Sequence, residues 1–178
     1  MSRFLSFALH VESVEEAAAK IKEFQNKFHD SRHVCWAYVL GTRRDVWQLN
    51  DNGEPSGTAG KPILGQINSK NLTDVLVVVV RYFGGIKLGT SGLISAYKEA
   101  ARLAIEDAGV VECHEMNVFN IEFAYEDMEG IMRIVKRESL DIISKDFNNL
   151  CSMTLSVRAD FYETVTEQLV KKGAHLNL

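Results

Sequence analysis

Two glycine-rich segments in the middle of the chain combine residue types that bind anions. The first runs from Asn50 to Pro62 with the sequence NDNGEPSGTAGKP, and the second runs from Arg81 to Gly92 with the sequence RYFGGIKLGTSG. Each supplies a lysine and hydroxyl side chains, and each leads into a segment with helical periodicity. Free N–H groups at a helix N-terminus, the positive end of the helix dipole and a mobile cation form a typical phosphate site. We therefore expect anion binding at these two loops.

The predicted anion- or nucleic-acid-binding residues are the charged and hydroxyl side chains of the two loops: Glu54, Ser56, Thr58, Lys61, Arg81, Lys87, Thr90 and Ser91. Four residues of neighbouring segments are expected to support them: Arg32, His33, Arg43 and Arg44. If these side chains converge, the six lysines and arginines among them form a local basic patch. The competing interpretation is that the glycines only permit tight turns with positive φ and that the cations are solvated.

Named catalytic or cofactor motifs do not fit either loop. Gly84 and Gly89 have the spacing of the two glycines of a P-loop, but Leu88 stands before Gly89 and no lysine follows it. His29, His33 and Cys35 are metal-ligand types, but no fourth ligand is evident, so a structural role is favoured. We therefore predict no metal and no cofactor, and no catalytic residue is assigned.

Arg81 ends a strongly apolar stretch, and a buried charge demands a partner. It could offer its guanidinium to a phosphate, or it could pair with Glu54 or Asp51 of the other loop; the pairing is favoured. Both loops follow predicted strands of one sheet, so both should open at the same edge of that sheet. The groove is expected to be bordered by Glu54, Thr58, Lys61, Arg81 and Lys87.

Periodicity predicts two groups of elements. In the first part we expect strands over 3–11, 33–40, 47–49 and 74–83, a helix capped by Ser13 and Glu16, a helix starting at Pro62, and a helix with an apolar stripe from Leu93 to Gly109. In the second we expect a strand over 119–123, a helix capped by Asp127, a hairpin of 140–147 and 150–158 across Asn148–Asn149, a helix capped by Asp160 and Glu163, and a strand over 175–178. That β-α-β-β-α-β order is typical of a ferredoxin-like domain.

Composition narrows the class of protein. With 46% hydrophobic and 25% charged residues, the 178-residue chain is typical of a globular protein. Its three cysteines form no paired motif, which favours a reducing cytoplasm. The longest apolar run, Val75 to Val80, is far too short to span a bilayer, so no membrane association is expected. Residues 1–110 carry 13 Lys and Arg against 12 Asp and Glu, whereas residues 111–178 carry 7 against 12, which favours the first part for phosphate binding.

At the two loops the chain resembles the YigZ/IMPACT family. The matching residues are His33, Cys35, Ala37 and Tyr38, then Asp51 to Pro62, Val79 to Gly89, Gly92–Leu93 and Ala96–Tyr97. The resemblance covers roughly residues 3–110 and indicates a bacterial-type member, without the extra N-terminal protein-binding domain of eukaryotic relatives. It implies an α+β protein with two domains: a two-layer α/β domain over 1–110, like one in a ribosomal small-subunit protein and elongation factor G, and a ferredoxin-like domain over 113–178.

Family members are linked to translation control, and nucleic-acid or ribosome binding is the usual proposal for bacterial ones. The leading hypothesis is therefore a non-enzymatic regulator that binds RNA or the ribosome through the glycine-rich groove. A second hypothesis is a hydrolase of peptides or phosphate esters, with Ser56, Thr58 or Ser91 as nucleophile and Lys61 or Lys87 as base. A third is a protein-binding adaptor that docks a partner through the acidic C-terminal domain.

Overall fold

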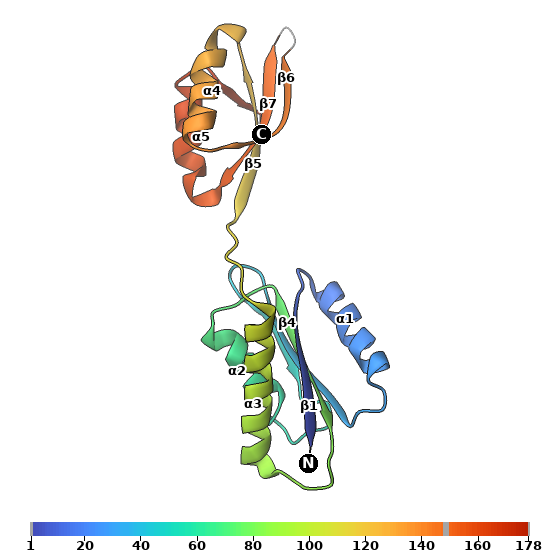
Figure 1. Ribbon diagram of the computed structural model, residues 1–178. Helices are drawn as coiled ribbons and strands as arrows, with labels where there is room; N and C mark the ends of the chain where they lie inside the picture. Colours follow the sequence, from blue (N-terminus) through green and yellow to red (C-terminus); the bar gives the residue numbers. More distant parts are fainter. Residues whose placement is uncertain (1, 148–149, 178) are drawn as a thin grey trace. The chain divides into compact units, whose positions relative to one another are not determined.

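The computed structural model describes residues 2–147 and 150–177. It divides into two compact units, residues 1–111 and 112–178, each with its own four-stranded antiparallel sheet (Figure 1). The predicted α+β fold class is confirmed. None of the helices in the described residues is both long enough and apolar enough to span a bilayer.

The first unit alternates strands and helices along the chain. Its elements are β1 (Arg3–His10), α1 (Val14–Lys27), β2 (His33–Leu40), β3 (Val46–Asn50), α2 (Gly60–Ser69), β4 (Val75–Tyr82) and α3 (Gly89–Ala108). The strand order in the sheet is β1-β4-β2-β3. Helix α1 lies on one face of the sheet, and α2 and α3 lie on the other (Figure 1).

Strand β4 separates two hydrophobic cores because its alternate side chains point to opposite faces. Leu76, Val78 and Val80 pack towards α1, whereas Val77 and Val79 pack towards α2 and α3. All five are completely buried, which explains the apolar run without alternation. The first unit thus has three layers, where the family resemblance implied two.

The antiparallel register brings the two glycine-rich loops to one edge of the sheet. Arg81, near the end of β4, lies opposite His33 at the start of β2. Asn50, at the end of β3, lies opposite Trp36, which also belongs to β2. The loops that leave β3 and β4 therefore open beside the start of β2, as predicted.

Helix α1 begins largely as predicted. The Ser13 hydroxyl accepts a hydrogen bond from the Glu16 N–H at 3.1 Å. The Glu16 carboxylate accepts from the Glu12 N–H rather than from that of Ser13, so the capping box is shifted by one residue. Helices α2 and α3 start at Gly60 and Gly89, earlier than predicted.

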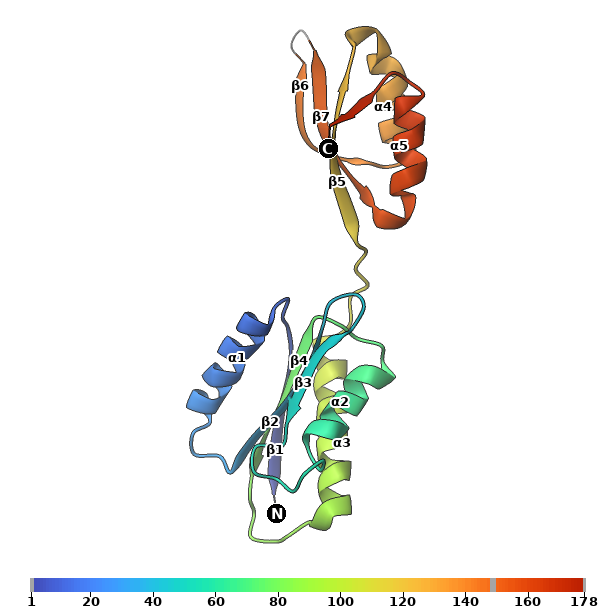
Figure 2. The same ribbon diagram turned by 180° about the vertical axis from the view of Figure 1, so that it is seen from behind.

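The second unit has the predicted ferredoxin-like order. Its elements are β5 (Met116–Phe123), the 3-10 turn η1 (Tyr125–Asp127), α4 (Met128–Arg137), β6 (Asp141–Phe147), β7 (Cys151–Arg158), the 3-10 turn η2 (Ala159–Phe161), α5 (Tyr162–Val170) and β8 (His175–Asn177). The strand order is β6-β7-β5-β8. Both helices cover one face of this sheet (Figure 2).

Of the two predicted caps in the second unit, Asp127 has the predicted position and Asp160 does not. The side chain of Asp127 makes no capping hydrogen bond at the start of α4, and α5 is preceded by Phe161 rather than Asp160. A 3-10 turn precedes each helix. Asp160 lies within the turn η2, where its carboxylate binds Arg158 at 2.7 Å. The predicted Asn148–Asn149 turn lies outside the described residues.

Candidate functional site

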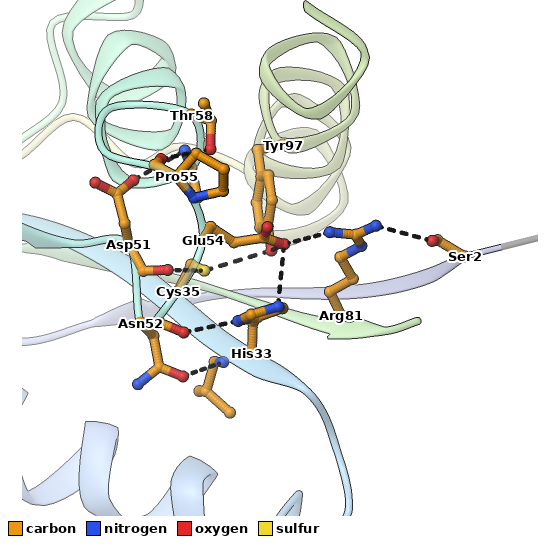
Figure 3. Close-up of polar contacts among 12 residues, drawn as sticks. Ser2, His33, Cys35, Asp51, Asn52, Glu54, Pro55, Thr58, Arg81 and Tyr97 are labelled. Atoms are coloured by element: carbon orange, nitrogen blue, oxygen red, sulfur yellow. Dashed lines mark hydrogen bonds and ion pairs between the residues drawn. The ribbon is translucent and has the colours of Figure 1, made fainter. Parts of the chain in front are cut away.

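The carboxylate of Glu54 is the centre of a buried polar cluster in the first unit (Figure 3). Its Oε1 accepts hydrogen bonds from Arg81 Nη1 at 2.6 Å and from the Tyr97 hydroxyl at 2.8 Å. The Nε2 atom of His33 lies 3.7 Å away. The Glu54 side chain is only 3% exposed and that of Arg81 only 5%. The predicted pairing of Arg81 with Glu54 is confirmed, and it links the first loop to the end of β4.

Arg81 makes further contacts that hold its guanidinium in place. Its Nη2 donates to the Ser2 hydroxyl at 3.2 Å. The guanidinium carbon lies 5.7 Å from the ring centre of Phe4 and 5.6 Å from that of Phe83. The Nε atom has no hydrogen-bond partner among the described residues although it is buried.

The start of β2 anchors the first loop through side chains of metal-ligand type. His33 Nδ1 donates to the Asn52 carbonyl at 2.8 Å, and the Asn52 side-chain oxygen accepts from the Val34 N–H at 2.8 Å. Cys35 Sγ donates to the Asp51 carbonyl at 3.0 Å. Burial raises the pKa of the Cys35 thiol to about 12, so the thiol stays protonated and remains a donor. His29 is remote from this anchor and binds the Asn26 carbonyl.

Asp51 occupies the N-terminus of α2. Its carboxylate accepts hydrogen bonds from the N–H groups of Gly57, Ala59 and Gly60 at 2.8–2.9 Å. Although burial acts to raise it, the pKa of Asp51 is lowered by these N–H groups and by the charge of Lys61. The helix begins at Gly60 rather than Pro62 because this side chain satisfies the first N–H groups from outside. The first loop therefore carries its own anion.

A groove of about 470 Å³ opens beside the Glu54 cluster. Six of the predicted residues line it: Arg32, His33, Glu54, Arg81, Lys87 and Thr90. The rest of its lining is Pro55, Phe83, Leu88, Gly89 and Leu93. Both loops thus contribute to one groove, as expected from the strand register.

Four predicted loop residues are not part of that lining. Thr58 is buried, and its hydroxyl donates to the Pro55 carbonyl at 2.7 Å. Lys61, Ser56 and Ser91 are exposed and lie outside the groove. The expectation that Thr58 and Lys61 border the groove is therefore wrong, because the first loop turns inwards to satisfy α2.

Two supporting arginines lie at the opposite end of the sheet. Arg43 and Arg44 follow the end of β2, whereas the groove adjoins its start, roughly 20 Å away for a strand of this length. Arg43 pairs with Asp45 at 3.2 Å. The Arg44 guanidinium donates to the Leu72 carbonyl and to the side chains of Asn68 and Asn71. The structure therefore does not bring these two cations into the expected patch.

The arrangement required for a Ser/Thr–Lys hydrolase is not assembled. Within residues 2–147 and 150–177, no hydrogen bond connects Ser56, Thr58 or Ser91 to Lys61 or Lys87. Both lysines are exposed, so neither has the desolvated environment that a lysine base requires.

Sequence reasoning missed two residues of the cluster. Tyr97 is expected in the apolar stripe of α3 and in the family match but is given no polar role, yet its hydroxyl binds Glu54, and burial raises its pKa, which keeps it a donor. A buried tyrosine hydroxyl needs a polar partner, and that requirement was the available signal. Asn52, at φ 43°, anchors the first loop to β2, and it has no role of its own in the sequence analysis of that loop.

Comparison with known proteins identifies the domain family of the part of the chain that holds the groove. Residues 1–105 match the Impact N-terminal domain. The chain belongs to the IMPACT family. The predicted resemblance is thereby confirmed, and both glycine-rich loops lie inside the matched domain.

Two bacterial IMPACT family proteins are similar to this chain over most of its length. An IMPACT family member of Haemophilus influenzae is 32% identical over 97% of this chain and 85% of its own. The IMPACT family member YigZ of Escherichia coli is 33% identical over 89% of this chain and 78% of its own. A solved structure, described as a hypothetical protein, shares 29% identity with a TM-score of 0.67 over 98% of this chain and 87% of its own.

Proposed function

We propose that this IMPACT family protein is a translation-related regulator that binds RNA or the ribosome through the groove of its first unit. One observation carries the proposal: three cations, Arg32, Arg81 and Lys87, line a groove in which Glu54 is the only acidic residue among those the structure describes. The chain as a whole has a net charge of −4, so this local excess of positive charge runs against its overall balance. Local positive potential attracts phosphates even on an acidic protein.

The cations have different roles. Arg81 is buried and neutralises Glu54, which leaves the exposed Arg32 and Lys87 to meet a phosphate. Helix α3 begins next to Lys87, and its N-cap residue, Leu88, provides no capping side-chain hydrogen bond. The positive end of this 20-residue helix therefore adds to the charge of Lys87.

The experiment compares charge removal inside and outside the groove. Binding of the full chain to ribosomes, tRNA and single-stranded RNA is measured at two salt concentrations for Lys87→Gln and Arg32→Gln. Each variant should weaken binding and reduce the slope of log affinity against log salt by about one, because one phosphate contact is lost. Melting temperatures should stay close to that of the parent, since both side chains are exposed.

Lys22→Gln is the matched control. It removes one positive charge from an exposed site on α1, which lies on the face of the sheet opposite to α2 and α3 (Figure 1). Binding by this variant should equal that of the parent. Absence of salt-sensitive binding to ribosomes, tRNA and single-stranded RNA alike would overturn the proposal.

A further inference from the structure

We infer that the groove takes a single-stranded segment of RNA, with one base stacked on Phe83 and an adjacent phosphate beside Lys87; the inference rests on the proposed function. Its basis is an aromatic ring presented to solvent within the basic groove. The Phe83 side chain lines the groove and is 47% exposed. What distinguishes Phe83 from other exposed aromatic side chains is its place among the cations of the groove, where its free ring surface can meet a ligand.

The Phe83 ring is already braced by the protein. The Arg81 guanidinium lies 5.6 Å from its centre, and that guanidinium is fixed in turn by Glu54 and Ser2. A ring held in this way loses little further freedom on stacking with a base. The Glu54 cluster therefore has a second role, which is to position a stacking platform.

Stacking on Phe83 selects single strands over duplexes. In a duplex the faces of the bases are covered by their neighbours, and the deep, narrow major groove of A-form RNA excludes side chains. In a single strand an unstacked base can lie against an aromatic ring, and every base has such a face. The groove has a volume of about 470 Å³, which lies within the roughly 300–1,000 Å³ that is usual for ligand sites in proteins.

Lys87 and the start of α3 supply the phosphate contact that a strand needs. Lys87 follows Phe83 by four residues, and both line the same groove together with Thr90 of the first turn of α3. Arg81 adds a buried guanidinium to the lining of the groove. The Nε atom of this guanidinium has no hydrogen-bond partner among the described residues. An aromatic platform beside cations is the combination by which single-stranded nucleic acid is bound without sequence preference.

The test measures fluorescence anisotropy with a labelled single-stranded RNA of about ten nucleotides, a typical site size for such proteins, and with its duplex. The full chain should bind the single strand more tightly than the duplex. Phe83→Leu should weaken single-strand binding roughly 5- to 150-fold, the loss of one stacked base, while duplex binding changes little. Phe83→Trp should retain single-strand binding because it keeps the platform.

Phe161 provides a matched control in the second unit. Its side chain is 50% exposed, and the Arg158 guanidinium lies 5.1 Å from its ring centre, so the same pair of residue types occurs outside the groove. Phe161→Leu should bind the single strand like the parent. Melting temperatures of both leucine variants verify that the fold is kept.

The outcomes separate the inference from the proposed function. Equal binding of single strand and duplex, unchanged by Phe83→Leu but weakened by Lys87→Gln, would overturn the stacking inference and leave RNA binding in place. A loss in Phe161→Leu equal to that in Phe83→Leu would overturn it as well. Absence of binding to any RNA or to ribosomes would overturn both.

Discussion

The two glycine-rich loops of the first unit have similar composition and adjoin the same edge of the sheet, yet their helices begin differently. In the first, the Asp51 carboxylate accepts three N–H groups at the start of α2. In the second, α3 begins beside Lys87 without a capping side chain. The first loop is thus neutralised from within, and the second presents its positive charge to the groove.

This difference teaches that glycines, a lysine and a helix start do not by themselves predict an anion site. The acids of the loop must be counted as well. Asp51 and Glu54 both belong to the first loop, and both are consumed by internal contacts. Between Phe83 and Gly92 the second loop has no acidic residue at all. Substitutions in the first loop should therefore change the stability of the protein, and substitutions in the second loop should change its binding.

The largest effect is expected where the two loops are joined. Arg81→Ala leaves Glu54 buried without its main partner, which should lower the free energy of unfolding by about 3–5 kcal/mol. Thermal and denaturant unfolding of the full chain measure this loss of stability. RNA binding should fall as well, because Arg81 lines the groove and holds the first loop beside it.

Arg102→Ala is the control for Arg81→Ala. It removes an arginine that binds Glu99 and Glu106 on the exposed surface of α3, so unfolding should change little. If Arg81→Ala melts like the parent and still binds RNA poorly, Arg81 is a ligand contact rather than a link between the loops.

A smaller effect is expected from crowding the first loop. A Cβ at Gly60 would lie 2.8 Å from Leu49 Cδ1 and 3.1 Å from the Asn50 backbone nitrogen, so Gly60→Ala should cost about 1–3 kcal/mol. Gly65→Ala, in the same helix, meets no atom within 4 Å and should stabilise it by about 0.5–1 kcal/mol. Denaturant midpoints of the two variants should move in opposite directions; a shift in the same direction would contradict the close approach at Gly60.

The smallest effect on stability is expected from the internal anion. Asp51→Asn keeps the shape, but an amide NH2 cannot accept, so the bond from the Gly57 N–H is lost and the bonds from Ala59 and Gly60 lose their charge. This should cost about 1–2 kcal/mol at neutral pH. Because the folded pKa of Asp51 lies below its ordinary value of 3.8, its contribution is complete above about pH 4 and is lost as the pH falls through the folded pKa.

Unfolding curves recorded from pH 7 downwards should show the parent and Asp51→Asn converging in acid. Asp45→Asn changes an exposed aspartate that pairs with the exposed Arg43; it is the control and should show little difference at any pH. A parent–variant difference that grows as the pH falls below 4 would show that Asp51 is not held as a carboxylate.

Much of the fold follows from local patterns in the sequence. The apolar run of β4, the stripe of α3 and the alternation in β7 each identify an element by its period. The meeting of the two loops also follows, since both leave strands antiparallel to β2. The pairing of Arg81 with Glu54 was predictable because a buried cation demands an acid, and few acids lie in the opposite loop.

The remaining features depend on contacts that no local pattern reveals. Thr58 and Lys61 have suitable types for anion binding, but the turn from Gly53 to Gly57 directs the first loop towards α2. Arg43 and Arg44 are close to the site in sequence only, because β2 carries the chain to the far end of the sheet. The third layer of the first unit depends on where α1 packs, which its apolar stripe does not specify.

The Glu54 cluster also bears on how the chain folds as the ribosome makes it. Strands β1 and β2 are synthesised before β4, the strand with which both of them pair. The two hydrogen-bond donors of Glu54 are synthesised after it: Arg81 follows 27 residues later and Tyr97 43 residues later. A nascent chain that ends before Tyr97 therefore has a carboxylate to bury and lacks one of its donors, so the first unit completes its core only once nearly all of it has been released. The cluster couples distant parts of this unit during synthesis and is complete only when α3 has been made as far as Tyr97.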